Sequence, residues 1–371
     1  MEELKEQIKA QYGCSPDQKT EAPPSIVFTA RTPPCAAIVG IVDAGQGSRG
    51  NPSSEVDEFQ AFVYLTQLQQ ALVYSTAASK WRTGKASFAN AGFLYWQLND
   101  VWAGPSWSSI NYDGSWRALH YAASKFLAPL MVFGKLKILE NCSSHCALGT
   151  LDALDVWLVN DFSTNVQGSL TVQVIDYMAK SLDDVIVLLS NYSVEAQALN
   201  VTLAWQWERV VDRKVQRPSI NKSFVKLEFC PHTISTEAGN CAVQYLASTK
   251  LQEFESGDTR LKVESVQSCH YNSKKNDNRC FSLVLGATGG IAPWVLLEST
   301  VPGTFSDNLL FVVPWDQTRV EFHVSSSVTS LPGVREMEES LRITWLRGSH
   351  AAMSPDHHNK VQSRNWFVTW M

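Results

Sequence analysis

Short hydrophobic runs, separated by turn residues, follow one another along the chain after Phe133. They are rich in Val, Ile, Leu, Thr and aromatic residues, the side chains that fit the pleated surface of a sheet. Runs of this length and spacing predict an antiparallel β-sandwich over residues 131–250. The expected strands are residues 155–159, 169–175, 184–189, 200–205, 223–229 and 241–245.

A second series of such runs follows the turn sequence Ser256-Gly-Asp258, which places a domain boundary near residue 250. We expect a second sandwich over residues 251–346. Its strands are expected at residues 261–266, 281–285, 294–297, 309–313 and 320–324. Residues 347–371, which include the pair His357-His358, are polar and irregular, and we expect a solvated tail there.

Two helices are expected before Phe133. Apolar side chains recur at helical spacing between residues 57 and 82, which predicts a helix with one face toward a core. These side chains are Phe62, Leu65, Leu68 and Leu72. A shorter helix is expected from Trp116 to about Leu127, with Ser115 as its N-cap and Pro129 ending it.

Between these helices, residues 92–98 predict a buried strand that ends in a cluster of polar and aromatic side chains. Gly104-Pro105 ends the element, because proline has no amide hydrogen to donate to a ladder. An ordinary core strand with a turn is one interpretation of this pattern. A sugar pocket is the other, because sugar hydroxyls need paired donors and acceptors and the apolar face of a sugar can lie on an indole. The candidate binding residues are Trp96, Asn99, Asp100, Trp102 and Trp107.

Residues 1–55 are rich in proline and glycine turns and predict a linker or a disordered segment, with a short strand at residues 36–42. The sequence Gly45-Gln-Gly-Ser-Arg-Gly50 follows and formally matches the dinucleotide fingerprint. That fingerprint needs its third glycine in the first turn of a helix. Pro52 biases Asn51 away from helix, so we do not expect nucleotide binding here.

The sequence around the aromatic cluster resembles the β-mannosidases of glycoside hydrolase family 2. The matching strings are Tyr95-Trp-Gln-Leu-Asn-Asp-Val-Trp102, Pro105-Ser-Trp-Ser-Ser109, Leu119-His-Tyr121 and Ala128-Pro-Leu130. A second match lies downstream, in Ile291-Ala-Pro-Trp-Val-Leu-Leu297 and Val301-Pro-Gly-Thr-Phe-Ser-Asp-Asn308. The resemblance covers roughly residues 56–325.

This resemblance implies an α/β portion followed by an all-β portion. Residues 56–130 would be the closing helix-strand-helix of a (β/α)8 barrel, and two immunoglobulin-like sandwiches would follow. The family removes terminal β-linked mannose from N-glycan-derived oligosaccharides by a retaining mechanism with a glycosyl-enzyme intermediate. No metal or organic cofactor is implied. We expect a monomer whose partners are β-mannoside oligosaccharides.

The resemblance also implies roles for the candidate residues. Trp96 would line the floor of the pocket beside the terminal sugar. Asn99 and Asp100 would bind sugar hydroxyls or fix neighbouring catalytic groups, and Asp100 could equally cap a loop. Trp102 and Trp107 would shape the mouth of the pocket.

The family's catalytic strings have no match in this chain. The family's acid/base is a Glu that follows Asn, and its nucleophile is a Glu in a Ser-Glu-aromatic-Gly string. The chain has no Asn-Glu pair, and Ser54-Glu55 is followed by Val56-Asp57. Only 91 residues precede Gly92, whereas a complete barrel takes about 250. We therefore assign no catalytic residue and expect a truncated chain that does not hydrolyse β-mannosides alone. The alternative is a non-catalytic carbohydrate-binding or scaffold fragment.

Composition and charge narrow the partners further. A formal net charge of -5 argues against a nucleic-acid-binding protein, which usually has a basic face. No run approaches 18 consecutive apolar residues, so we expect no membrane partner. Residues 1–7 are charged and offer no signal-peptide core. The resemblance nevertheless implies a lysosomal protein.

The cysteines leave two interpretations open. Cys230 with Cys241, and Cys269 with Cys280, each flank a short loop, and they could form hairpin disulfides or remain buried thiols. Cys142-Ser-Ser-His-Cys146 offers three ligands without a second pair at zinc spacing, so we expect no zinc site there. Four Asn-x-Ser/Thr sequons suit a glycosylated protein; they begin at Asn141, Asn191, Asn200 and Asn221.

Overall fold

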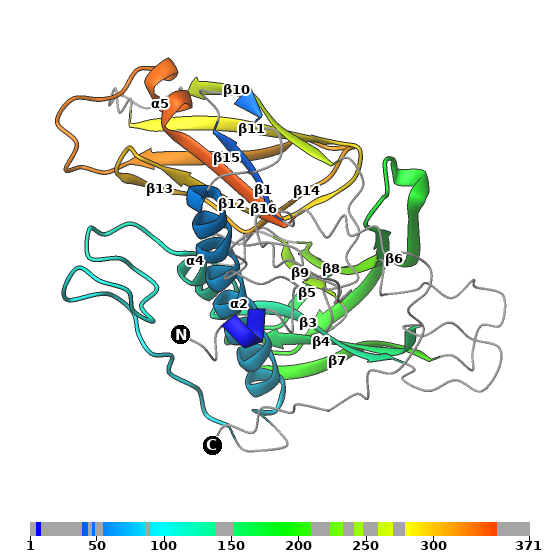
Figure 1. Cartoon of the computed structure of the whole chain (residues 1–371). Coiled ribbons are helices and arrows are strands. Elements are labelled where there is room, and N and C mark those ends of the chain that lie inside the picture. Colours follow the sequence, from blue (N-terminus) through cyan, green and yellow to red (C-terminus); the bar gives the residue numbers. More distant parts are fainter. Residues whose placement is uncertain are drawn as a thin grey trace, which may run out of the picture.

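The structure is a computed structural model that describes ten stretches of the chain. These are residues 5–8, 39–43, 47–48, 55–85, 90–138, 151–208, 223–232, 241–247, 259–269 and 279–346. Within them, strands predominate, and two units of paired sheets lie beside two longer helices (Figure 1). The predicted predominance of β-structure is therefore confirmed.

The first sandwich consists of two antiparallel sheets, with strand orders β3-β4-β7 and β6-β5-β8-β9. Side chains along β5 alternate between the two faces, so that Leu170 and Val172 point inward beside Phe229 and Leu227 of β8. The short 3-10 helix η2 (Leu182–Asp184) precedes β6. The strands are β3 (Leu130–Ile138), β4 (Leu151–Asn160), β5 (Val166–Asp176), β6 (Val185–Ala196), β7 (Asn200–Glu208), β8 (Ser223–Pro231) and β9 (Ala242–Leu246). Each of the six strands expected here overlaps one of these.

The second sandwich has the sheets β10-β11-β15-β13 and β14-β12-β16-β1-β2. Its apolar core includes side chains from strands of both sheets. The strands are β10 (Arg260–Ser268), β11 (Cys280–Thr288), β12 (Ala292–Ser299), β13 (Gly303–Phe305), β14 (Leu310–Val312), β15 (Thr318–Val324) and β16 (Leu341–Leu346). The five expected strands are present, and β13, β16 and helix α5 (Val334–Ser340) were not foreseen.

A strand from the N-terminal part of the chain completes one of these sheets. Strand β1 (Val39–Asp43) pairs antiparallel with β16, and β2 (Gly47–Ser48) pairs with β1. The predicted short strand therefore exists, but the expectation of a linker is wrong for these residues, because backbone pairing incorporates them into the sheet. Gly47, the second glycine of the fingerprint-like string, lies in β2 rather than in a phosphate-binding turn.

The helices α2 (Glu55–Thr83) and α4 (Ala118–Phe126) pack on one another and on both sandwiches (Figure 1). Leu65 and Leu68 are fully buried, which confirms the predicted apolar face of α2. The N-cap of α4 is Arg117 rather than Ser115, whose hydroxyl instead donates to Asp113. None of the described helices is both long and apolar enough to span a bilayer.

An aromatic cluster joins the two sandwiches to the helices. Phe224 of the first sandwich has ring centroids 4.8 Å from Phe311 and 5.2 Å from Trp294 of the second. Tyr245 stacks on Phe311 at 3.8 Å, and burial raises the pKa of its phenol. Tyr64 of α2 donates a hydrogen bond from its hydroxyl to the carbonyl of Trp294 at 2.9 Å. Three parts of the chain thus meet at Trp294.

Residues 92–98 differ from the expectation. They are not assigned to any strand, and the neighbouring bridge of Asn99 to Ile110 is isolated. The prediction of a buried strand is therefore wrong for the described chain. A strand needs hydrogen-bonding partners on a neighbouring strand, and the local sequence pattern alone cannot supply them.

We predict that the aromatic cluster contributes strongly to stability. Phe224→Ala removes a ring whose residue is 0% exposed, so it should lower the free energy of unfolding by about 3–5 kcal/mol. The matched control is Phe59→Ala, because Phe59 is 67% exposed. Urea unfolding followed by circular dichroism measures both. Equal losses for the two variants would contradict the assignment of Phe224 to the common core.

Candidate functional site

Residues 92–117 form a continuous segment on the side of α2 and α4 (cyan in Figure 1). Side chains alternate along its first part: Phe93, Tyr95 and Gln97 are half-buried, whereas Leu94, Trp96 and Leu98 are exposed. The inward rings pack on the helices, with centroids 5.8 Å apart for Tyr74 and Tyr95 and 6.0 Å apart for Phe93 and Phe126. The peptide bond between Trp96 and Gln97 is cis. The helices thus fix one face of the segment and leave the other open.

The second part of the segment is held by a buried ion pair. Nη2 of Arg117 lies 2.7 Å from Oδ2 of Asp100, and the two side chains are 15% and 4% exposed. Arg117 also donates from Nη1 to the carbonyls of Ser106 at 2.7 Å and Ser108 at 3.0 Å. Its Nε donates to the Asn111 side chain. One guanidinium therefore ties four points of the loop to the start of α4.

The carboxylate of Asp100 is stabilised in its ionised form. Hydrogen bonds from the Ser106 and Ser108 side chains and the charge of Arg117 hold the pKa of Asp100 below its usual value, against the opposing effect of burial. An acid with a lowered pKa is a poor proton donor near neutral pH. The environment of Asp100 therefore suits a residue that holds the loop in place through Arg117 and Ser106, rather than a general acid.

Ser109 is the centre of a second network. Its hydroxyl donates to the carbonyl of Leu98 at 2.8 Å, and it lies 3.0 Å from both the Tyr95 hydroxyl and Nδ1 of His120. A serine hydroxyl has one proton, so Ser109 accepts from Tyr95 and from a protonated Nδ1. Burial lowers the pKa of His120, which favours the neutral imidazole over the charged form. The network locks the loop against α4, which begins one residue after Arg117.

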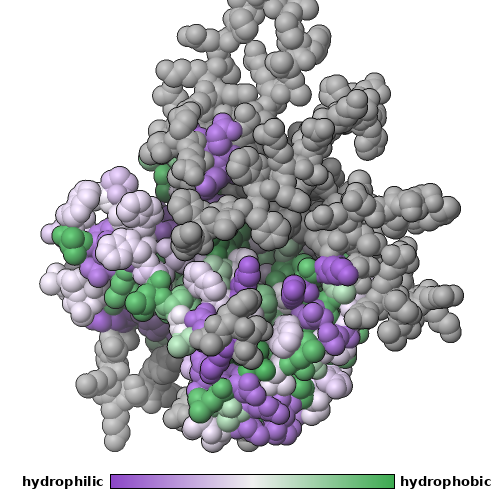
Figure 2. All heavy atoms as spheres, turned by 90° about the horizontal axis from the view of Figure 1, so that it is seen from below, coloured by the Kyte–Doolittle hydropathy of each residue, from purple (hydrophilic) through white to green (hydrophobic). Residues whose placement is uncertain are grey.

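Three of the candidate residues are tryptophans that are largely exposed to solvent. Trp96, Trp102 and Trp107 are 69%, 62% and 70% exposed. Asn99 is also exposed, and its side-chain amide donates to the Asp100 carbonyl at 3.1 Å. On the face seen from below, hydrophobic residues lie at the surface among hydrophilic ones (Figure 2). The candidate residues thus divide into a buried anchor, Asp100, and an exposed polar and aromatic group.

Two contacts define the chain near Trp102 and Trp107. The indole of Trp102 lies over Gly104 so closely that a Cβ on Gly104 would meet it at 2.1 Å. Nε2 of Gln70 in α2 donates to the carbonyl of Trp107 at 2.9 Å. A side chain at position 104 would therefore require the Trp102 indole to shift, and α2 holds the backbone of the far end of the loop.

Sequence reasoning missed the residues that organise the site. Arg117, Ser106, Ser109 and His120 were not singled out, although they carry most of the loop's side-chain hydrogen bonds. Arg117 and Asp100 are 17 positions apart, and no spacing rule pairs residues at that distance. The exposed residues were easier to find because clustered indoles and amides are visible in the sequence itself.

Some of the predicted disulfides, glycosylation sequons and metal ligands lie within the described residues. Cys230–Cys241 and Cys269–Cys280 are disulfides, which settles the choice left open by the sequence. Asn191 and Asn200 are exposed at the surface of the first sandwich. The sequons at Asn141 and Asn221 and the string Cys142–Cys146 lie outside the described residues.

Each of three comparisons with known proteins finds a similarity to mannosidases. The mannosidase Ig-fold domain family matches residues 266–347. Beta-mannosidase of Capra hircus is 28% identical over 307 residues, covering 81% of this chain and 31% of the goat protein. Beta-mannosidase A of Aspergillus fumigatus is 32% identical over 151 residues, covering 40% of this chain and 15% of the fungal protein.

A solved structure shares the fold. The beta-D-mannosidase of Dictyoglomus thermophilum superposes with a TM-score of 0.54 at 19% identity, covering 81% of this chain and 31% of that protein. The chain therefore spans about a third of the length of the relatives it matches. These findings support the β-sandwich domains.

We predict that the stability of the loop held by the Asp100–Arg117 ion pair depends on pH. Because the folded pKa of Asp100 is lowered, its contribution to stability is present above the unfolded pKa, about 3.9, and is lost as pH falls through the folded value. The protection factors of the amides in residues 99–117, which correct the exchange rate for its intrinsic pH dependence, should therefore fall on acidification below about pH 4 in the wild type. In Asp100→Asn the exchange should already be fast at neutral pH.

The control for this measurement is Asp155→Asn, which removes a carboxylate that accepts from Gln206 in the first sandwich. Exchange in residues 99–117 should be unchanged by it. Slow neutral-pH exchange in Asp100→Asn would show that the ion pair does not hold the loop.

Proposed function

We propose that this chain, a homologue of β-mannosidases, forms the C-terminal part of a β-mannoside-binding unit. In this proposal residues 56–130 close a (β/α)8 barrel, and residues 131–250 and 251–346 are two immunoglobulin-like domains beside it. Residues 1–55 and 347–371 lie outside these units, except that β1 and β2 extend the second sandwich. The homology supports the family, and the alternating exposure of residues 93–98 supports a segment built to pair with further strands.

The observation that carries the proposal is the exposed aromatic group on an anchored loop. Trp96, Trp102 and Trp107 offer apolar faces to solvent, whereas Arg117 and Asp100 fix the backbone beneath them. A sugar needs an aromatic surface for its apolar face and fixed polar groups for its hydroxyls. Asn99 is the exposed polar member of the group, and we assign it to a sugar hydroxyl.

Asp100 has a different role in this proposal from that of Asn99. Its carboxylate is already occupied by Arg117 and Ser106, so it positions the loop and does not bind sugar itself. A retaining glycosidase needs two carboxyl groups about 5–5.5 Å apart. We assign neither of these to Asp100 and propose that the catalytic pair comes from elsewhere in a complete barrel. The isolated chain is then inactive.

The cellular context belongs to the same proposal. We propose a lysosomal location and a monomeric state for the functional unit. The two disulfides and the exposed sequons at Asn191 and Asn200 support passage through an oxidising, glycosylating compartment.

Activity is tested with a chromogenic β-mannoside. The purified chain should show no turnover, with a complete β-mannosidase as the positive control. Turnover by the chain would overturn the proposal that the catalytic carboxyl pair comes from elsewhere in a complete barrel.

Binding is tested separately by calorimetry with a β-1,4-linked mannobiose. Trp102→Ala or Trp107→Ala should weaken affinity about 10-fold, since an aromatic contact is worth on the order of 0.5–1.5 kcal/mol beyond burial. The matched control is Tyr192→Ala, an exposed aromatic of β6 in the first sandwich, which should change nothing. Affinity lost only in Tyr192→Ala would instead favour the alternative, a carbohydrate-binding sandwich.

A further inference from the structure

One side of the first sandwich ends in two open strands. Strand β6 is the outermost strand of the sheet β6-β5-β8-β9, and β7 is the outermost strand of the sheet β3-β4-β7. The two strands follow one another in the chain, with residues 197–199 between them. Among the described residues, no further strand pairs with the free side of β6 or of β7. An outermost strand presents unpaired backbone N–H and C=O groups, which can pair with another chain.

Strand β6 carries an apolar run at this open edge. Residues 185–189 are Val-Ile-Val-Leu-Leu, and Ile186 and Val187 are 39% and 52% exposed. Uncharged runs with high β-propensity are the segments that pair between chains. Edge strands are often blunted by lysine or proline, and β6 contains neither. The monomeric state proposed above therefore calls for another means of covering this edge.

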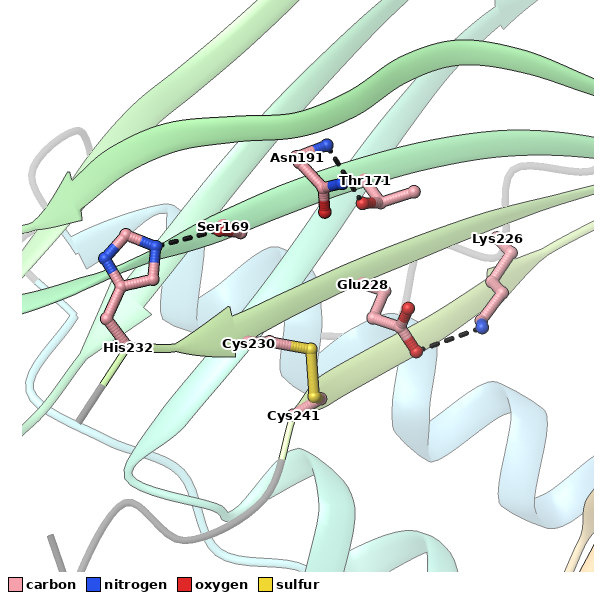
Figure 3. The surroundings of a disulfide bond; sticks show 8 residues. All are labelled: Ser169, Thr171, Asn191, Lys226, Glu228, Cys230, His232 and Cys241. Atoms are coloured by element: carbon pink, nitrogen blue, oxygen red, sulfur yellow. Dashed lines mark hydrogen bonds and ion pairs between the residues drawn. A yellow bond between two sulfur atoms is a disulfide. The ribbon is translucent and has the colours of Figure 1, made fainter. Parts of the chain in front are cut away.

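A bulge follows the apolar run and places Asn191 at the surface. Leu189 and Tyr192 pair with residues of β5 that are two positions apart. Ser190 and Asn191 therefore both face Thr171. Asn191 has a φ of 49°, a left-handed conformation that asparagine adopts more readily than most residues. Its backbone amide donates to the Thr171 hydroxyl at 3.3 Å (Figure 3), and the residue is exposed. The bulge thus presents the asparagine of an Asn-x-Ser sequon at the edge.

Strand β7 begins with a second exposed sequon asparagine. Asn200 is the first residue of β7, and its Nδ2 donates to Oε1 of Gln197 at 3.0 Å. The hydroxyl of Thr202, the third residue of this sequon, accepts from the Gln197 amide at 3.3 Å. Leu199 and Leu203 are 59% and 39% exposed. Each of the two open strands therefore carries one exposed sequon asparagine close in sequence to exposed apolar side chains.

We propose that Asn191 and Asn200 carry N-linked glycans that cover the free edges of β6 and β7 and prevent the first sandwich from pairing with other chains. This inference rests on the passage through a glycosylating compartment proposed above. An N-linked glycan is bulky and well solvated. It keeps a second strand from approaching to the spacing of about 4.8 Å that backbone pairing needs. The glycans thus do for this edge what lysine or proline does for other edge strands.

The linkage forms by transfer of an oligosaccharide from a lipid pyrophosphate donor, catalysed by the transferase of the compartment. Nδ2 of the asparagine bonds to the anomeric carbon of the sugar and loses one proton. The bond from that carbon to the pyrophosphate oxygen breaks, and the lipid pyrophosphate leaves with the electron pair. Nδ2 starts with two hydrogens and keeps one. In Asn200 the remaining hydrogen can still donate to Gln197, so the modification is compatible with the contact in the folded chain.

The test uses the full chain, secreted behind an added signal peptide from animal cells that retain high-mannose glycans. An endoglycosidase that leaves one sugar on each occupied asparagine marks the sites, and peptide mass spectrometry identifies them. We expect a retained sugar on Asn191 and on Asn200. Light scattering should show a monomer before trimming and a shift to larger species after it.

Two further variants show whether the open edge itself causes the association. Ser193→Ala removes the sequon of Asn191 and should give the same shift to larger species. Adding Val187→Lys should restore the monomer, because a lysine on an edge strand opposes pairing. The matched control adds Leu331→Lys instead. Leu331 is 38% exposed and lies between β15 and α5 of the second sandwich, so a lysine there should leave the association unchanged.

Three results would each overturn the proposal. They are an Asn191 without sugar, a protein that stays monomeric after trimming and in Ser193→Ala, and equal rescue by Leu331→Lys. Sugar missing from Asn200 as well would also contradict the glycosylating compartment. Calorimetry with mannobiose is independent of these measurements, so a failure of the sugar-binding function is recognised separately.

Discussion

The packing of Trp294 against Phe224, Phe311 and α2 is the contact on which the rest of the structure depends. Each sandwich has its own apolar core, and this aromatic cluster belongs to a further core that combines side chains of both sandwiches and of the helices. The hydrogen bond from Tyr64 to the Trp294 carbonyl fixes α2 at the same point. Helix α4 packs on α2, and Arg117 stands at its start. The position of the candidate site therefore follows from a contact between sandwiches that lies outside it.

The candidate loop separates the task of holding its shape from the task of contacting a ligand. Burying an ion pair costs desolvation, which is offset only when the remaining hydrogen-bonding capacity is satisfied. Arg117 meets this condition because its donors reach Asp100, Asn111 and two backbone carbonyls. The exposed indoles make few such contacts and remain open on one face. A loop organised in this way can present apolar surface to water without collapsing onto it, which is the property that a sugar-binding surface requires.

The sequence correctly predicted elements whose hydrophobic pattern repeats over a few residues. It did not predict contacts between residues that are far apart in the chain. The apolar face of α2 and eleven expected strands are confirmed because alternation and helical spacing are local properties. The pairing of β1 with β16 joins residues about 300 positions apart, and the sequence of residues 39–43 does not indicate which strand they pair with. The same limit applies to Arg117, whose four partners are set by the path of the loop. The exposed Trp and Asn residues were found because they stand together in the sequence, whereas the Asp100 anchor could be interpreted only once Arg117 was seen beside it.

Residues 92–98 show how the pattern of a strand can persist where the strand itself does not form. Tyr95 and Phe93 face the helices, and Leu94 and Trp96 face solvent, which is the two-residue period of a strand. Backbone groups of such a segment need partners on either side, and an unpaired apolar edge in water invites association. The goat relative is about three times longer than the stretch of it that this chain matches. A segment whose pattern requires neighbours, in a chain whose relatives carry much more sequence, supports the proposal that the sugar site is completed by further strands of a barrel.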